Sequence, residues 1–312
     1  MYIIMKILVT GGSGMIGKNL QQINKTNENI WLFPNSTEMN LLKEESIDKY
    51  FNEHKPDFIV HLAANVGGLF KNLKYKVEMF RENILMNENI LHIANKYNVN
   101  NGIFCCSTCI FPKNPEKYPI TENMIMDGKP HDSNDSYGYS KRLLYFQCCN
   151  YNKQYNRKYI CISPCNLYGK YDNFNLENSH VISGLIHKFY LASINKTELH
   201  VKTGMHSERQ FMLTSDLCKI LIMMINNFDD VDYDNIIFAT KDEYIINIIK
   251  IISNNFSDVK YDIIEQEDGQ IKKTCSYDLF NKNFSNFNLT HIEKGIFETI
   301  EWFKNNYDTI RK

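Results

Sequence analysis

The sequence lacks an excess of charge of either sign. Its 312 residues include 35 Lys and Arg against 36 Asp and Glu, which leaves a formal net charge of −1. Binding to nucleic acid or to an anionic membrane surface needs a basic face, so we expect neither partner. Long hydrophobic runs are also missing: none approaches the roughly 18 uninterrupted apolar residues typical of a transmembrane helix. The composition therefore predicts a globular protein without a membrane span.

A secretory signal and a paired metal motif are absent as well. The first apolar run is short and ends at Thr10-Gly11-Gly12, so we expect no signal peptide. Nine cysteines spread along such a chain predict reduced thiols and a cytoplasmic location. Cys106 and Cys109 form a C-x-x-C pair, but a zinc site would need a second pair at suitable spacing. We therefore expect no metal site.

What the chain does contain is an alternation of two kinds of segment. Helix-like stretches such as 43–54 and 81–97 separate short apolar runs. These β-prone runs lie at residues 6–10, 29–33, 57–64, 101–107 and 158–164. Apolar strands that alternate with amphipathic helices predict a parallel sheet covered on both faces, a Rossmann-type doubly wound α/β fold.

Beyond Tyr168 the alternation loosens and polar, Asn-rich loops become frequent. We predict a dinucleotide-binding domain over residues 1–168. Residues 169–312 are expected to form mainly a smaller α/β substrate-binding domain, with some segments returning to the first domain. Such a domain would lie at the carboxyl ends of the strands, where open α/β sheets bind ligands.

A glycine-rich loop follows the first predicted strand. It reads "VTGGSGMIG" and contains Gly12-x-Gly14-x-x-Gly17. Glycine allows a tight turn there, close approach of the backbone to a pyrophosphate and close packing of helix on strand. A purely structural turn could also use glycine, but the place between a strand and a helix favours dinucleotide binding. The expected cofactor contacts in this loop are Gly11, Gly12, Ser13, Gly14, Met15, Ile16 and Gly17.

The end of the second strand distinguishes NAD from NADP. An acidic residue there binds the ribose 2′-hydroxyl of NAD and repels the 2′-phosphate of NADP. Here Pro34-Asn35-Ser36 follows the strand, and the first acid is Glu38. The pattern favours NADP(H), although the loop has no Arg or Lys to bind the phosphate.

The stretch "NDSYGYSKRLLY" contains two tyrosines just ahead of Lys141. Residues four apart on a helix share a face, so Tyr137 is the partner of the lysine and Tyr139 is not. A nearby ammonium favours the phenolate, which makes tyrosine an acid–base catalyst. An isolated Y-x-x-x-K would more often be surface sequence, but here Ser107 stands upstream at the end of a buried strand. Glycine loop, Ser and Tyr-x-x-x-Lys in this order resemble the extended short-chain dehydrogenase/reductase superfamily.

Local motifs narrow the resemblance to the GDP-L-fucose synthase family, over residues 6 to 307. They are "HLAANVGGLFKNLKY", "CSTCIFP", "NDSYGYSKR", "NLYGKYDNFN", "NSHVISGLIHK", "RQF" and "EDGQIKKT". The resemblance implies conversion of GDP-4-keto-6-deoxy-D-mannose to GDP-L-fucose, by 3,5-epimerisation and then NADPH-dependent reduction of the C4 ketone. A homodimer is also expected, through the helix that carries Tyr137 and Lys141.

The resemblance also assigns residues. Ser107, Tyr137 and Lys141 match the reductase triad, and Cys109 and His180 match the epimerisation pair. The GDP-sugar contacts would be Asn166, Lys188, Arg209 and Lys273. Further cofactor contacts would be Ser36, Leu62, Ala63, Ala64, Lys141, Pro164, Asn166, Leu167 and His180.

Several positions depart from the family pattern. Cys165 replaces a Thr, Lys170 and Tyr171 replace Pro-His, Ser183 replaces a Pro and Asn40 replaces an Asp. None of these changes removes a catalytic group.

The chemistry agrees with the residues. A C4 ketone acidifies C3 and C5, and inversion needs a proton removed from one face and returned to the other. Cysteine and histidine have ordinary pKa values near 8.5 and 6.5, which suit this exchange.

Two other functions stay open. A nucleotide-sugar 4,6-dehydratase or epimerase could use the same fold, but dehydratases carry Asp-Glu where Thr108-Cys109 stands here. A non-enzymatic NADP-sensing protein is the second alternative, but such proteins usually lose the tyrosine or the lysine.

Overall fold

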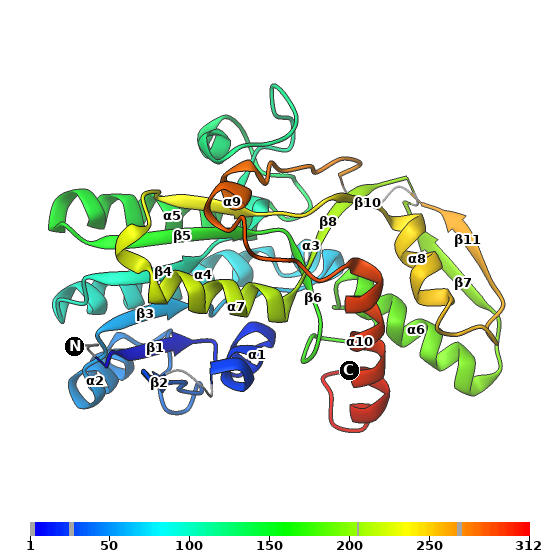
Figure 1. Ribbon diagram of the computed structural model, residues 1–312, viewed down its shortest axis with the longest axis horizontal. Helices are drawn as coiled ribbons and strands as arrows, with labels where there is room; N and C mark the ends of the chain where they lie inside the picture. Colours follow the sequence, from blue (N-terminus) through cyan, green and yellow to red (C-terminus); the bar gives the residue numbers. More distant parts are fainter. Residues whose placement is uncertain (1–3, 25–27, 205, 267–269) are drawn as a thin grey trace.

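The structure, a computed structural model, describes residues 4–24, 28–204, 206–266 and 270–312. Its largest element is a six-stranded sheet in the order β2-β1-β3-β4-β5-β9, and every neighbouring pair is parallel (Figure 1). These strands are β1 (Lys6–Thr10), β2 (Ile30–Leu32), β3 (Phe58–His61), β4 (Asn101–Cys105), β5 (Lys158–Pro164) and β9 (Asn235–Phe238).

Side chains of each strand alternate between two cores, one on each face of the sheet. In β1, Leu8 belongs to one core, whereas Ile7 and Val9 belong to the other. The first core includes residues of α2 (Glu44–His54), α4 (Lys76–Lys96) and α5 (Asp135–Tyr155). The second includes residues of α1 (Met15–Ile23), α7 (Thr214–Asn226) and α9 (Asp278–Asn283). Because both faces are covered, all central strands are apolar, as the sequence predicted.

The strand order reverses between β1 and β3. After β1 the chain adds β2 on one side and then crosses over to add β3 on the other. In an open parallel sheet the loops on either side of such a point diverge, which leaves a crevice at the carboxyl ends of the strands. The prediction of a Rossmann-type doubly wound sheet is therefore confirmed, and it places a ligand site beyond Thr10 and His61.

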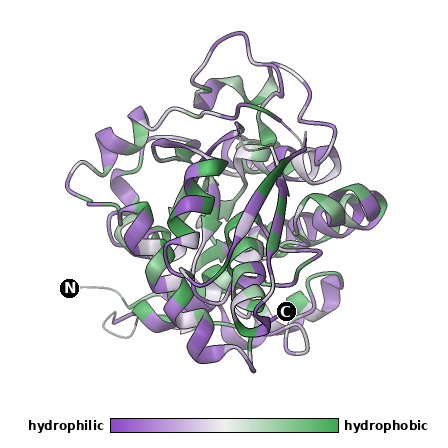
Figure 2. Cartoon of the chain, turned by 90° about the vertical axis from the view of Figure 1, so that its right-hand side faces the viewer, coloured by the Kyte–Doolittle hydropathy of each residue, from purple (hydrophilic) through white to green (hydrophobic). Residues whose placement is uncertain are grey.

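The second half of the chain builds two smaller sheets. One contains β10 (Asp242–Tyr244), β8 (Glu208–Leu213) and β6 (Asn166–Tyr168), and the other pairs β11 (Tyr261–Glu265) with β7 (Leu199–Thr203). The helices α6 (Val181–Asn195), α8 (Ile245–Ser253) and α10 (Ile292–Asn306) pack around a third apolar core. Figure 2 shows that the apolar residues gather on the inward sides of helices and strands.

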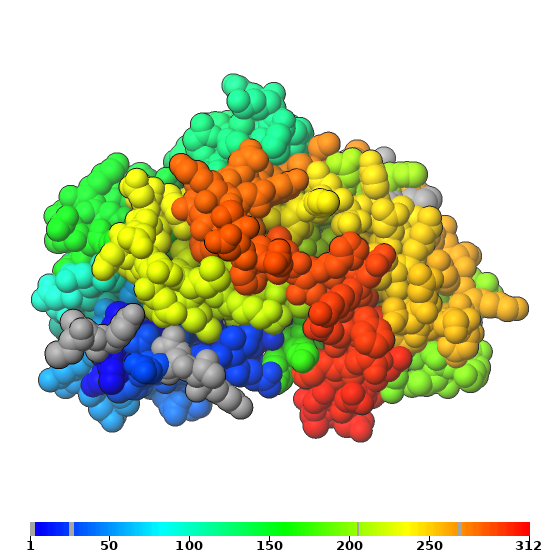
Figure 3. Space-filling model, viewed as in Figure 1, coloured from blue at the N-terminus to red at the C-terminus, as the bar shows by residue number. Residues whose placement is uncertain are grey.

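Not all of the second half belongs to this smaller part. Helix α7 and strand β9 join the large sheet and its core. Figure 3 shows α9 and the chain around it packed over the region of α7 and β9. The boundary at residue 168 itself stays a prediction. No helix in the described ranges is long and apolar enough to cross a membrane.

Short elements complete the chain. They are α3 (Leu69–Lys74) and the 3₁₀ turns η2 (Thr108–Ile110), η3 (Glu122–Met126) and η4 (Phe228–Asp230).

The start of α1 packs closely against the glycine loop. A Cβ atom at Gly17 would lie 2.5 Å from both Gly11 O and Gly12 Cα. These are backbone atoms and cannot move aside without distorting the loop. A Cβ at Gly14 would meet only Gly11 O, at 3.2 Å.

We therefore predict that Gly17→Ala lowers the free energy of unfolding by about 1–3 kcal/mol, the usual cost of an overpacked site. Thermal or urea unfolding without cofactor measures this loss. Gly14→Ala is the matched control, and we expect it to cost less than about 1 kcal/mol. Equal stability of the two variants would show that the loop accommodates a side chain at Gly17.

Candidate active site

A cavity of about 810 Å³ opens at the carboxyl ends of the central strands. Residues from both halves of the chain line it, in agreement with the crevice that the strand order creates. All five predicted catalytic residues line it: Ser107, Cys109, Tyr137, Lys141 and His180. So do the predicted cofactor contacts Gly11, Ser13, Gly14, Met15, Ile16, Gly17, Ser36, Leu62, Ala63, Ala64, Pro164, Asn166 and Leu167.

The glycine loop forms one end of the cavity. Gly11 has φ of +73°, and a Cβ there would lie 2.8 Å from the backbone nitrogen of Ala63. Only glycine satisfies both constraints, so the loop is held close to β3 and leaves the start of α1 open. Such a bare backbone cradle at a helix N-terminus fits a pyrophosphate. Gly12 lies behind this surface, where a Cβ would meet Phe33 at 3.0 Å, and does not line the cavity.

The loop after β2 forms the cavity wall next to this cradle. The Asn35 side-chain oxygen accepts hydrogen bonds from the backbone N–H groups of Thr37 (2.8 Å) and Glu38 (3.1 Å). In return the Glu38 carboxylate accepts from the Asn35 N–H at 2.8 Å. Glu38 is therefore engaged within its own turn, while Asn35 and Ser36 face the cavity. Neither contributes the acid that would favour NAD over NADP.

Tyr137 and Lys141 lie together in the wall formed by α5. Lys141 is only 1% exposed, and its ammonium donates to the backbone oxygen of Cys105 at 2.8 Å. Burial raises the pKa of Tyr137 well above its ordinary value, and the nearby thiols of Cys105 and Cys109 add to this effect. The sequence argument expected Lys141 to favour the phenolate. Here burial dominates, so the phenol is a protonated hydrogen donor.

Tyr139 points away from this site. It is 37% exposed, and the guanidinium carbon of Arg142 lies 5.5 Å from its ring centroid. The four-residue spacing thus separates the two tyrosines as the sequence predicted.

Cys109 lies in the turn that follows β4. Its sulfur accepts hydrogen bonds from the Asn134 side-chain nitrogen at 3.0 Å and from the Lys273 ammonium at 3.3 Å. Burial acts to raise the pKa of the thiol, but the charge of Lys273 and hydrogen bonds from Ser107 and Lys273 outweigh it, with a further contribution from the charge of Arg209. The net pKa is below that of an ordinary thiol, so Cys109 is suited to act as a base.

His180 enters the cavity from the start of α6. It occupies the N-cap position, and its side chain is exposed and makes no capping hydrogen bond. Next to it, the buried carboxylate of Asp172 accepts a hydrogen bond from the Ser183 hydroxyl. Burial raises the pKa of Asp172, and the charge of His180 opposes that rise. Ser183, where the family pattern has proline, thus supplies a partner to a buried carboxylate beside the histidine.

The end of the cavity near Cys109 is cationic. Arg209 and Lys273 line it, while the side chain of Asn166 donates to the backbone oxygen of Gln210 at 2.9 Å. Lys188 is partly exposed on α6 and does not line the cavity, so its role stays a prediction. Residues 267–269, the first part of the "EDGQIKKT" motif, lie outside the described residues.

Sequence reasoning missed three polar side chains that line this end: His131, Asn134 and Gln270. His131 Nδ1 accepts the backbone N–H of Ser133 at 3.2 Å, which leaves the Nε2 atom as the protonated nitrogen of the neutral ring. Asn134 lies inside the stretch "NDSYGYSKR", three residues before Tyr137. Its nearness in the sequence to Tyr137 was the available signal.

The described residues contain no group of three or more His, Cys, Asp or Glu side chains placed to hold a metal ion.

A family model described as "NAD dependent epimerase/dehydratase family" matches residues 7–238. The chain belongs to this family. Among curated members, it is 39% identical to a GDP-L-fucose synthase of Dictyostelium discoideum over 98% of the chain and 97% of that protein. It is 32% identical to a GDP-L-colitose synthase of Yersinia pseudotuberculosis over 96% of the chain and 98% of that protein.

Solved structures of the family agree. A crystal structure of a GDP-L-fucose synthetase from Naegleria fowleri bound to NADP matches 100% of this chain and 96% of that one. The TM-score is 0.90 and the sequence identity 34%. The resemblance to GDP-L-fucose synthases in this epimerase/dehydratase family is therefore confirmed.

The contact between Lys273 and Cys109 leads to a prediction about thiol reactivity. We expect Lys273→Met to raise the pKa of Cys109, because it removes the ammonium that stabilises the thiolate. Alkylation of Cys109 by iodoacetamide, followed by mass spectrometry of its peptide, should slow at least about fivefold at pH 7.

Lys272→Met is the matched control. Lys272 pairs with Glu208 at 3.1 Å and does not line the cavity. Its loss should leave the alkylation rate of Cys109 unchanged. If both variants behave alike, Lys273 does not control the thiol.

Proposed function

We propose that the protein converts GDP-4-keto-6-deoxy-D-mannose to GDP-L-fucose, by 3,5-epimerisation followed by NADPH-dependent reduction of the C4 ketone. One observation supports this proposal most directly: the thiol of Cys109, which accepts a hydrogen bond from Lys273 at 3.3 Å, lines the same cavity as the buried phenol of Tyr137. One cavity thus contains a base for the epimerisation and an acid for the reduction. The names of the relatives, and the NADP in the Naegleria structure, support the same reaction and cofactor.

In the first step, Cys109 and His180 move the protons at C3 and C5. The two residues come from separate elements, the turn after β4 and the start of α6, and both line the cavity. Inversion needs one group on each side of the sugar, so a pair from two elements suits it. The cationic side chains of Arg209 and Lys273 bind the nucleotide diphosphate and the developing negative charge.

In the second step, Tyr137 gives its proton to the oxygen on C4. NADPH, when bound, supplies the hydride. The oxygen of Ser107 accepts the Cys109 N–H at 3.2 Å, which holds the serine in the cavity wall, where its side chain would contact the C4 oxygen. One N–H of Lys141 is bonded to Cys105 O, which leaves two for the nicotinamide ribose.

Other products of the same chemistry are the alternative. Because one relative is named GDP-L-colitose synthase, GDP-L-colitose is the second candidate product.

A single experiment in deuterated water tests both steps. Wild-type protein with GDP-4-keto-6-deoxy-D-mannose and NADPH should oxidise the cofactor and place deuterium at C3 and C5 of the product. Its kcat/KM should be higher for NADPH than for NADH. Tyr137→Phe should lower the rate of reduction on the order of 10²–10⁴-fold and keep the exchange, whereas Cys109→Ser and His180→Asn should lose the exchange. Tyr137→Phe and Cys109→Ser should bind NADPH nearly as wild type does.

Tyr139→Phe is the matched control for Tyr137→Phe, since Tyr139 lies on the same helix outside the cavity. It should keep nearly full activity. Normal inversion of both centres in Cys109→Ser and His180→Asn would assign the proton transfers to other residues.

We further propose that the protein is a homodimer and works in the cytoplasm. All nine cysteines are free thiols, which supports a reducing compartment. On α5, Tyr139, Leu143 and Phe146 follow one another at helical spacing and are 37%, 42% and 49% exposed. On the neighbouring helix α4, Val77 (73%) and Phe80 (39%) are exposed as well. Two such helices from each of two subunits would form a four-helix interface.

The dimer is tested with Phe146→Lys. A lysine in the centre of an apolar interface leaves its charge without water, so the variant should sediment as a monomer in analytical ultracentrifugation. Phe297→Lys is the matched control, because Phe297 is 52% exposed on α10, away from this face. A wild-type protein that sediments as a monomer would contradict the proposal.

A further inference from the structure

The side-chain amide of Asn134 forms a hydrogen bond that is unusual for its position in the helix. It occupies the N-cap position of α5, where an asparagine side chain ordinarily accepts a hydrogen bond from the first turn of the helix. Here it makes no capping hydrogen bond. Instead, its nitrogen donates to the sulfur of Cys109 at 3.0 Å.

The oxygen of the same amide has no partner. Asn134 Oδ1 is buried and accepts no hydrogen bond in the structure, although Asn134 lines the cavity. A buried acceptor without a partner is costly, and in a native protein such an atom is explained by strain, by a catalytic role, or by a water molecule or ion that completes it. The direction of the amide follows from its surroundings. The ammonium of Lys273, 3.3 Å from the same sulfur, favours the thiolate. A thiolate is an acceptor, so the amide nitrogen of Asn134, and not its oxygen, faces the sulfur.

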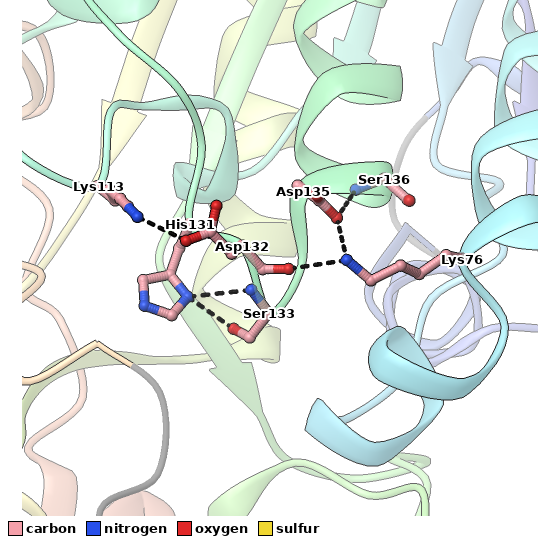
Figure 4. Close-up of polar contacts among 7 residues, drawn as sticks. All are labelled: Lys76, Lys113, His131, Asp132, Ser133, Asp135 and Ser136. Atoms are coloured by element: carbon pink, nitrogen blue, oxygen red, sulfur yellow. Dashed lines mark hydrogen bonds and ion pairs between the residues drawn. The ribbon is translucent and has the colours of Figure 1, made fainter.

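The loop that carries Asn134 is fixed from three sides (Figure 4). Lys76 of α4 binds the carboxylate of Asp135 at 2.9 Å and the backbone oxygen of Asp132 at 3.0 Å. Lys113 pairs with the side chain of Asp132 at 2.5 Å. His131 accepts from the N–H of Ser133 within the loop. These contacts hold the amide in place before any substrate arrives.

Helix α5 also approaches the turn of Cys109 closely. A Cβ atom at Gly138 would lie 2.7 Å from the backbone oxygen of Cys109. The glycine, one turn after Asn134, therefore allows the contact between amide and thiol.

We propose that Asn134 is a bridging residue of the epimerisation site: its nitrogen orients the sulfur of Cys109, and its oxygen accepts a hydrogen bond from the C3 hydroxyl of the sugar. This inference rests on the proposed function. Of the two carbons at which Cys109 exchanges a proton, only C3 carries a hydroxyl. The Oδ1 atom of Asn134 belongs to the same amide as the nitrogen that donates to the Cys109 sulfur, so it is suited to bind the C3 hydroxyl. This contact would favour sugars that carry a C3 hydroxyl.

The nitrogen half is tested on the protein without substrate. In Asn134→Ala, alkylation of Cys109 by iodoacetamide at pH 7, followed by mass spectrometry, should slow roughly tenfold, because the thiolate loses a hydrogen bond. In Asn134→Asp it should slow further, since a carboxylate next to the sulfur repels the thiolate. Asn114→Ala, an exposed site outside the cavity, is the matched control and should react as wild type. An unchanged rate in Asn134→Ala would overturn this half.

The oxygen half is tested with two sugars, GDP-4-keto-6-deoxymannose and its 3-deoxy analogue. Oxidised NADP is bound so that reduction does not follow, and deuterium exchange at C5, which both sugars undergo, is measured. Wild type and Asn114→Ala should favour the sugar with the C3 hydroxyl roughly ten- to a hundredfold in kcat/KM, because the analogue leaves Oδ1 unpaired. Asn134→Ala should reduce this preference to less than about threefold.

The outcomes separate the two proposals. An active wild type that treats both sugars alike, or an Asn134→Ala variant that binds NADPH normally and keeps the full preference, would overturn this inference alone. A wild type that exchanges no proton of either sugar and oxidises no NADPH would overturn the proposed function and the sugar half with it. The alkylation result would still decide whether Asn134 controls the thiol.

Discussion

The N-terminal half of α5 lies against the turn that follows β4, and the acid–base groups of the site depend on this contact. Gly138 allows it, since any side chain there would collide with the backbone of Cys109. Arg142 holds it, because its guanidinium donates to the backbone oxygens of Ile110 and, at 2.7 Å, Gly128. Buried carbonyl groups need such partners. The helix and the turn therefore form one rigid unit, which sets the position of each polar side chain that they carry.

Two acid–base groups in this unit have their pKa values moved in opposite directions. Burial raises the pKa of the Tyr137 phenol and keeps it protonated, and the nearby thiols of Cys105, Cys109 and Cys106 act in the same direction. Cys109 is partly buried, but the charge of Lys273, hydrogen bonds from Ser107 and Lys273, and the charge of Arg209 outweigh the effect of burial on the pKa of its thiol. A protein that must first remove protons and later donate one requires a base and an acid together. The difference arises from where the cations lie, on the side of the smaller sheets.

The smaller part of the molecule therefore contributes more than a cover for the cofactor. It brings His180, Arg209 and Lys273 to the cavity from three separate segments. It also contains a departure from the family pattern that is compensated locally: Ser183 donates to the buried carboxylate of Asp172, as a proline could not. That hydrogen bond supports the start of α6, where His180 lies.

The sequence by itself determined the elements whose signals are local. The apolar runs predicted the observed bounds of β1 and β5. The glycine pattern located a loop that lines the cavity, and the four-residue spacing separated Tyr137, in the cavity wall, from the exposed Tyr139. It did not reveal the smaller sheets, which strand sits at the far edge of the large sheet, or the partners of Asn134. The contact of Lys273 with Cys109 joins residues 164 positions apart. Only the tertiary structure decides such contacts, and the pKa values that follow from them, because desolvation and charge depend on the atoms that surround a group in space and not on its neighbours along the chain.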